Sequence, residues 1–494
     1  MKKPHTIIIG AGFAGISAAT ELAHKGHEVT VVERHSVPGG RARVFSAEGF
    51  QFDMGPSWYW MPDVFDEYFA RYGKKTSDYY DLIRLDPSYR VFWPDDQWDI
   101  PAGMRELEHL FESTEQGSAE RLREFLRDAA VKYGISMGEL IYKPGKSVLE
   151  FVDFRLLRQA MRLSLFSSVS AHIRNYFSHP KLIELLEFPV LFLGALPEET
   201  PALYSIMNHA DLTLGTWYPM GGMGKITEAM HQLAEELGVS FEFNVNVEEI
   251  TLVDGKATGI IANGKTIAAD AVIAAGDYHH MEELLPQSVR NYTPGYWEKR
   301  VMAPSCLIFY IGTSQKITGL KHHNLFFDES FRQHGNEIYR QPSWPTKPLF
   351  YTCVPSITDP SVAPEGCENL FVLIPLAPGL PGDDEAIREN YFNQVMDRLE
   401  KRSGSSIRKH IVFKRSYCTS DFSRDYNAFK GNAYGLANTL GQTAIFKPRI
   451  DNKRTKGLFY AGQLTVPGPG VPPALISGNI AANQVIRHKT KSPL

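Results

Sequence analysis

The sequence predicts an α/β fold, and three observations carry the prediction. A short apolar strand, a glycine-rich turn and a helix stand at the start of the chain. A second strand, glycine-rich loop and helix stand at its end. The 494 residues are enough for about three domains, and the middle of the chain mixes helix-like stretches with apolar strand-like runs. We therefore predict a parallel-sheet domain joined to a mixed sheet-plus-helices domain.

The composition is that of a globular protein and excludes several classes. With 43% hydrophobic and 22% charged residues, the chain is neither disordered nor collagen-like nor a coiled coil. The net charge of −4 provides no basic field, so we predict no nucleic-acid partner. The 4 cysteines form no C-x-x-C pair, which predicts no metal site and a reducing, cytoplasmic compartment. No apolar run is long enough to span a membrane.

The strongest motif stands in the first 33 residues. Residues 6–9 favour a buried strand, G-A-G-F-A-G follows at 10–15, and residues 16–25 favour a helix. A second strand, predicted at 27–32, leads to Glu33. This order of strand, G-x-G-x-x-G turn, helix, strand and acid is typical of dinucleotide binding, whereas a lone glycine motif is weak evidence.

Each residue of this motif has a physical role. Gly10 permits the tight turn, Gly12 lets a pyrophosphate approach the backbone, and Gly15 lets the helix pack on the strand. The start of the helix offers free N–H groups and a positive dipole end to the phosphates. Glu33 can accept hydrogen bonds from ribose hydroxyls and would repel a 2′-phosphate, which argues against NADP.

The choice between NAD and FAD depends on further glycine-rich segments. P-G-G-R-A at 38–42 and F-D-M-G-P at 52–56 are either contacts to a second, flat ligand or surface turns, and composition alone leaves both open. A strand at 457–462, a Gly/Pro-rich loop at 467–473 and a helix at 474–486 indicate a second ligand-contacting unit. A cofactor site assembled from both ends of the chain favours FAD.

Together these segments resemble the FAD-dependent carotenoid desaturases of the bacterial phytoene desaturase type. The more specific matches are T-D-P-S-V-A-P-E-G at 358–366 and A-G-Q-L-T-V-P-G-P-G-V-P at 461–472. The resemblance implies a Rossmann-like FAD-binding domain of the amine oxidase and phytoene desaturase type. It also implies FAD contacts at Gly10, Gly12, Gly15, Glu33, Arg34, Gly40, Arg41, Gly55, Val247, Gly462, Gly470, Val471, Pro472 and Ala474.

The resemblance also divides the chain. Residues 1–73, 221–289 and 442–494 would form the FAD-binding domain. Residues 74–220 and 290–441 would form the substrate domain, which would also contact the membrane. Strands are expected at 239–247, 257–262, 271–275, 306–311 and 369–375.

Residues 151–173 are a candidate membrane contact. Arg155, Arg158 and Arg162 share one face of a predicted amphipathic helix, beside aromatic and aliphatic neighbours. Such a helix packs on a core more often than on lipid, but a carotene substrate must be drawn from a membrane. We therefore expect a peripheral location at the inner face of the cell membrane.

The resemblance implies that FAD receives a hydride from a carbon beside the polyene, after which a neighbouring carbon loses a proton. Glu150 is the candidate base, although a solvated acid near a helix start is the plainer interpretation. Trp58, Tyr59 and Trp60 either line a tunnel or pack in a core. The pair His322-His323 is expected at the surface rather than in a ligand site.

The predicted function is desaturation of an acyclic carotenoid end, and the resemblance favours a 1-hydroxycarotenoid 3,4-desaturase slightly over a phytoene desaturase. A carotenoid isomerase, a flavin amine or porphyrinogen oxidase and a non-enzymatic lipid-binding protein of the same fold are the remaining alternatives. The sequence determines neither the electron acceptor nor the oligomeric state.

Overall fold

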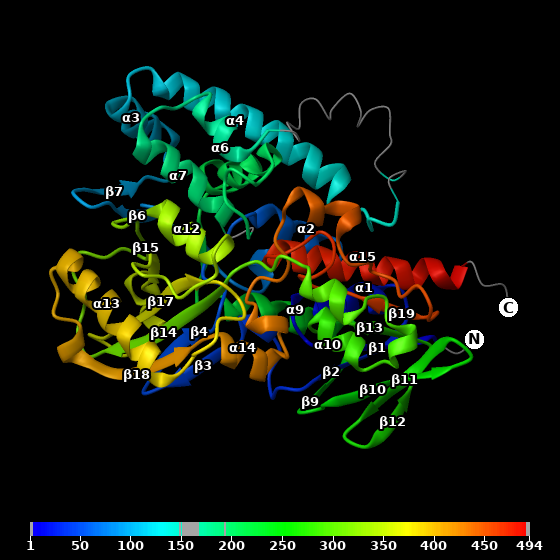
Figure 1. Cartoon of the computed structure of the whole chain (residues 1–494). Helices are drawn as coiled ribbons and strands as arrows, with labels where there is room; N and C mark the ends of the chain where they lie inside the picture. Colours follow the sequence, from blue (N-terminus) through cyan, green and yellow to red (C-terminus); the bar gives the residue numbers. More distant parts are fainter. Residues whose placement is uncertain (1–2, 148–149, 151–166, 192–193, 491–494) are drawn as a thin grey trace.

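A computed structural model describes residues 3–147, 150, 167–191 and 194–490 of the chain (Figure 1). Two large sheets organise these residues. One is parallel and lies with the chain termini, and the other is mixed and lies at the opposite side of the molecule (Figure 1).

The parallel sheet brings three distant parts of the chain together. Its strand order is β19 (Leu458–Tyr460), β13 (Ala271–Ala274), β1 (His5–Ile9), β2 (Glu28–Glu33) and β9 (Ser240–Phe243). Ile7 and Ile8 of β1 are fully buried because helices and a second small sheet cover both faces. The predicted α/β architecture is therefore confirmed.

Helices from the two ends of the chain lie side by side on one face of this sheet. They are α1 (Phe13–His24) and α15 (Val471–Thr490), and α9 (Gly224–Glu236) packs beside α1 (Figure 1). A Cβ atom on Gly478 would lie 2.0 Å from the carbonyl oxygen of Ala14, so the close crossing requires a glycine in α15. Helix α15 begins at Val471, three residues before the predicted start.

The opposite face carries a three-stranded antiparallel sheet of β10 (Val247–Val253), β11 (Lys256–Ala262) and β12 (Lys265–Ala268). The single strand expected at 239–247 is wrong in extent. Strand β9 ends at Phe243, and Asn244 adopts φ 59°, a left-handed conformation that asparagine tolerates and that redirects the chain into β10.

The mixed sheet has the order β18 (Ile411–Tyr417), β14 (Ser305–Thr313), β17 (Glu368–Leu376), β16 (Phe350–Cys353), β15 (His323–Phe326), β6 (Tyr89–Phe92) and β7 (Gln97–Ile100). Its strands pair antiparallel except for β15 with β6. Strand β14 is buried along its whole length because both sheet faces are covered, in keeping with the apolar run at 306–311.

Helix α13 (Glu385–Ser403) packs on one face of the mixed sheet, while α3 (Met104–Thr114), α4 (Ser118–Ile135), α6 (Val169–Arg174) and α7 (Pro180–Leu191) gather at one end of the molecule (Figure 1). The shorter elements include β3 (Val44–Ala47), β4 (Phe50–Asp53), α2 (Pro62–Ala70), β8 (Trp217–Pro219), α10 (Tyr278–Glu283) and α14 (Thr419–Tyr426). They also include β5 (Leu82–Arg84), α11 (Pro294–Glu298) and α12 (Phe331–Tyr339).

The predicted membrane helix lies mostly outside the described residues, which omit 151–166; after that gap, α6 begins at Val169. Among the helices of the described segments, none combines the length and the apolar character needed to cross a bilayer.

Candidate functional site

A cavity of about 390 Å³ is lined by residues from both large sheets. Its walls come from the β1–α1 turn, the end of β2, residues 39–42 and 55–58, the start of β10, the end of β13 and residues 462–474. Because these segments are hundreds of residues apart, only the folded chain creates this cavity. We call the part beside the parallel sheet the cofactor half. The apolar part, lined by residues 58, 60, 61 and 65 and by β14 and β17 of the mixed sheet, is the substrate half.

Most of the predicted FAD contacts lie in the wall of this cavity. They are Gly10, Gly12, Glu33, Arg34, Gly40, Arg41, Gly55, Val247, Gly462, Gly470, Val471, Pro472 and Ala474. Gly15 does not line the cavity but stands behind the turn, where a Cβ atom would lie 1.9 Å from the carbonyl oxygen of Gly10. This position fits the helix-packing role that the sequence predicts for the third glycine.

The Glu33 carboxylate stabilises the glycine-rich turn. It is 6% exposed, and its two oxygens accept hydrogen bonds from the backbone N–H groups of Ala11 at 2.8 Å and His35 at 2.9 Å. A carboxylate has about four acceptor positions, so Glu33 keeps capacity for hydroxyl donors from a ligand.

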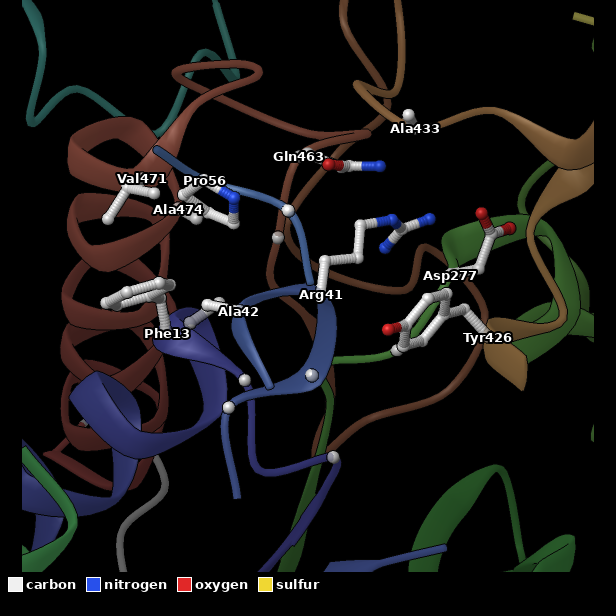
Figure 2. A pocket seen from close by; sticks show the side chains of 18 of the residues that line it. Phe13, Arg41, Ala42, Pro56, Asp277, Tyr426, Ala433, Gln463, Val471 and Ala474 are labelled. Carbon is white, nitrogen blue, oxygen red and sulfur yellow. The ribbon is translucent and has the colours of Figure 1, made fainter. Parts of the chain in front are cut away.

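Arg41 provides positive charge in the cofactor half. Figure 2 shows its side chain extending into the cavity toward Asp277 and Tyr426. Its guanidinium carbon lies 5.2 Å from the Tyr426 ring centroid, and its Nε is buried without a hydrogen-bond partner. Burial lowers the pKa of Arg41 and raises the pKa of Asp277, while the attraction between the two opposes both shifts. The unpartnered Nε leaves a donor available to an anionic ligand.

The start of α15 faces the same space. Val471 and Ala474 lie on its first turn near Pro56 and Phe13 (Figure 2). Residues 472 and 473 are prolines without N–H groups, and the N–H of Ala474 bonds the carbonyl of Gly470 at 3.0 Å. Because the first residues of α15 line the cavity, the positive end of the helix dipole lies at the cavity wall.

The substrate half is apolar and aromatic. Its lining residues include Trp58, Trp60, Met61, Phe65, Met207, Met223, Cys306, Ile308, Leu373 and Tyr434. Trp58 and Trp60 therefore line the cavity, whereas Tyr59 is buried and packs against Phe65 with its hydroxyl on Tyr80. The lining positions Asp277, Tyr426 and Met207 carry no motif in the sequence, and reasoning from sequence missed them.

The wall suits FAD at both ends. A carboxylate and glycine turns suit the adenosine and diphosphate portion, Arg41 supplies an unpartnered cationic donor, and the apolar half has flat aromatic walls beside a positive helix end. This fold and cavity define a flavin-dependent oxidoreductase.

The chain belongs to the flavin-containing amine oxidoreductase family, whose model matches residues 13–486. It is 41% identical over 482 residues to the carotenoid 3,4-desaturase of Haloarcula japonica, covering 97% of each chain. It is 32% identical over 494 residues to a 4,4′-diapophytoene desaturase of Staphylococcus aureus, covering 97% of this chain and 98% of the relative. An oxidoreductase of Methanosarcina mazei shares the fold with a TM-score of 0.65 at 18% identity, covering 98% of this chain and 100% of the other. The protein is thus an FAD-dependent oxidoreductase of the carotenoid desaturase group, as the motifs predicted.

Glu150 and the pair His322-His323 do not lie where the sequence analysis expected them. Glu150 is not among the residues that line the cavity; its Oε1 accepts the backbone N–H of Lys146 at 3.1 Å. The expectation that His322 and His323 lie at the surface is wrong, because they are only 4% and 0% exposed. His323 is the first residue of β15, a strand that lies inside the mixed sheet and is buried along its whole length.

Proposed function

We propose that the protein introduces a carbon–carbon double bond into the end of an acyclic carotenoid, with the 3,4 bond of a 1-hydroxylated carotenoid as its preferred site. The 41% identity to a carotenoid 3,4-desaturase over nearly the whole of both chains is the observation that carries this proposal. FAD supplies the acceptor for two electrons and one hydrogen when it is bound. The residues of the chain bind and orient the polyene and exclude water.

The substrate half of the cavity supports an apolar ligand. Met207, Met223 and the two tryptophans at 58 and 60 present thioether and ring surfaces, which suit a long polyene. The acidic and basic side chains of the cavity wall, among them Glu33, Arg41 and Asp277, belong to the cofactor half. A polyene would therefore meet few groups that it must desolvate.

Phytoene desaturase is the second candidate, because a diapophytoene desaturase is 32% identical over 97% of the chain. Purified, FAD-loaded protein is incubated with phytoene and with a 1-hydroxylated acyclic carotene, each dispersed in lipid. Formation of a product that absorbs at longer wavelength only from the hydroxylated carotene supports the 3,4-desaturase. Conversion of phytoene alone supports the second candidate, and oxidation of amines without either conversion contradicts both.

We also propose that the protein collects its substrate from the inner surface of the cell membrane. The basic and aromatic sequence of residues 151–173 supports this proposal. Liposome co-sedimentation tests it: replacing Arg155, Arg158 and Arg162 by glutamate weakens binding to vesicles rich in anionic lipid, whereas replacing three exposed arginines elsewhere does not. Equal binding of both variants would contradict the proposal.

A further inference from the structure

Two histidines and a cysteine meet within the mixed sheet. His323 is the first residue of β15 and pairs with Cys353, the last residue of β16. His322 directly precedes β15, and all three side chains are buried. One ring nitrogen of each histidine and Sγ of Cys353 lie within 4.8 Å of one another. The pairing of the two strands thus gathers three side chains that can ligate a metal ion.

Each imidazole has one nitrogen that is hydrogen-bonded and one that is free. Nδ1 of His323 lies 2.6 Å from the Tyr351 hydroxyl, and Nδ1 of His322 lies 2.8 Å from the Thr358 hydroxyl. Among the described residues, Nε2 of both histidines is buried without a hydrogen-bond partner. A buried polar atom without a partner costs free energy, and most such atoms are satisfied. Two free nitrogens in one cluster therefore indicate that the cluster binds a ligand.

Both rings are held in the way that metal-ligating histidines are held. Such a histidine usually bonds a fixed partner through its second nitrogen, which sets its tautomer and orientation. The two hydroxyl groups at the Nδ1 atoms have this role. In addition, the His323 ring stacks on the indole of Trp58 with centroids 4.2 Å apart, and the His322 ring meets the Tyr218 ring edge to face at 4.6 Å. The cluster is thus preorganised on several sides.

The surroundings favour a cation over an anion. Asp53 lines a small cavity of about 20 Å³ together with Cys353, and its carboxylate accepts two backbone N–H groups at 2.9 Å each. Asp359, whose neighbour in the chain bonds His322, accepts the backbone N–H of Gly221 at 2.6 Å. Both carboxylates are thus held by backbone donors, and their charges attract a positive ion.

A path leads from the substrate half to the cysteine. Ser57 and Met223 line both the large cavity and the small one, so the two cavities adjoin there. Cys353 lines the small cavity. A cation that enters through the substrate half would meet the Met223 thioether before the thiol, and thioethers and thiolates are soft ligands that select Cu(I).

The number of ligands distinguishes Cu(I) from zinc. Structural zinc sites are closed by four protein ligands, whereas the described residues of this cluster offer three. Cu(I) accepts three soft ligands in one plane. Ligand atoms bound at about 2.0–2.3 Å from a metal lie about 3.5 Å apart, so small movements of the side chains bring the three atoms onto one ion.

We propose that His322, His323 and Cys353 bind one Cu(I) ion through the two Nε2 atoms and the sulfur. The ion replaces the thiol proton, which leaves along the path by which the ion enters. The bound ion holds His323 against Trp58 and thereby fixes part of the cavity wall. The site does not depend on which substrate the flavin oxidises. The sequence analysis expected no metal site because no two cysteines are paired, whereas these ligands are joined by strand pairing.

Anaerobic copper titration of the FAD-loaded protein tests the site. The protein is kept in ascorbate and titrated with Cu(I) against bathocuproine disulfonate, a coloured Cu(I) chelator that removes weakly bound copper. We expect the protein to retain one equivalent of Cu(I). The X-ray absorption spectrum of the complex should show one sulfur and two nitrogen neighbours of the metal.

The variants Cys353→Ser and His322→Asn each remove one ligand atom. Serine keeps the size of cysteine, and asparagine keeps a polar atom near Nδ1 that can bond Thr358. We expect both variants to lose Cu(I) affinity by about 100-fold or more. Cys418→Ser is the matched control: Cys418 is also buried, at the N-cap of α14, where serine is favourable, and C418S should keep the wild-type affinity.

Thermal unfolding with and without copper compares each protein with itself, so a variant that is less stable from the outset still gives an answer. Cu(I) should raise the melting temperature of the wild type and of C418S and leave that of C353S unchanged. The visible flavin bands show that each variant is folded. Failure of the wild type to retain copper against the chelator overturns the proposal. Equal affinity in all four proteins, or retention of zinc without Cu(I), also overturns it.

Discussion

The two halves of the cavity differ in their electrostatics. In the cofactor half, Glu33 and the Arg41–Asp277 pair place charges against the ligand. Outside the wall of the substrate half, burial disfavours the charged forms of two groups: it raises the pKa of Asp211 to about 7 and lowers that of His322 to about 3. The two halves therefore differ in the chemistry of their walls, one charged and one apolar.

The halves also differ in how they use backbone and side chains. The cofactor half brings backbone close to the ligand through glycine turns, whereas the substrate half presents large rings supported by partners behind them. Trp60, for example, donates its indole N–H to Thr216 at 2.9 Å, and Thr216 lies beside Asp211. Substitutions in the first half should act through backbone clashes and charge, and those in the second through packing and buried hydrogen bonds.

We expect the largest effect on the free energy of unfolding from Gly15→Ala, with Gly12→Ala as its control. A methyl group at Gly15 meets the Gly10 carbonyl oxygen at 1.9 Å, whereas a methyl group at Gly12 has no protein atom within 4 Å. G15A should lower the free energy of unfolding by about 3 kcal/mol even without FAD. G12A should change it by less than about 1 kcal/mol and reduce only FAD affinity. Urea unfolding of the apoprotein and flavin titration measure the two effects, and equal stability of both variants would contradict the assignment.

Asp211→Asn should change the dependence of stability on pH. The folded-state pKa of Asp211, about 7, lies above its usual value, so between about pH 4 and about pH 7 the folded state holds a proton that the unfolded state has released. The free energy of unfolding therefore falls as pH rises through this window, by about 1.4 kcal/mol per unit of pKa shift. D211N should flatten this decline in urea unfolding at about pH 5 and about pH 8.

The exposed Asp95 provides the control for this experiment. D95N should keep the wild-type dependence on pH. A D211N protein whose stability declines with pH as steeply as that of D95N would show that Asp211 is not held protonated.

Glu33→Gln should weaken FAD binding by about 10- to 100-fold. The amide keeps one acceptor oxygen, but the charge that receives the N–H groups of Ala11 and His35 is lost. Glu28, exposed at the start of the same strand, is the control, and E28Q should bind FAD with wild-type affinity. Fluorescence titration with FAD measures both, and identical affinities would remove Glu33 from the cofactor site.

The smallest expected effect is a difference in stability between variants of the two lining tryptophans, Trp58 and Trp60. Trp60→Phe should destabilise the protein by about 1 kcal/mol more than Trp58→Phe, because only the Trp60 indole N–H has a hydrogen-bond partner. Thermal unfolding of the two variants compares them directly. A lower melting temperature for W58F would indicate that stacking on His323 matters more than the bond to Thr216.

Local sequence determined the cofactor half. The turn at 10–15, Glu33 and the two glycine clusters near residues 40 and 55 depend on backbone geometry within a few residues. Their spacing therefore predicted segments that the structure places at the cavity wall. The same holds for α1 and β14, whose periodicity and apolar character appear directly in the chain. The division of the chain at residues 73, 220, 289 and 441 stays a prediction, although each large sheet draws its strands from one predicted set of segments.

Only the tertiary structure decided the substrate half. Trp58 and His323 lie 265 positions apart in the chain, and no local pattern predicts that their rings stack with centroids 4.2 Å apart. Burial depends on how the layers of the fold cover a strand, and it contradicts the surface prediction for His322 and His323. The position of Glu150 outside the cavity lining was likewise not evident from the sequence. The geometry of a turn is determined by neighbouring residues, whereas the environment of a side chain depends on which distant strands cover it.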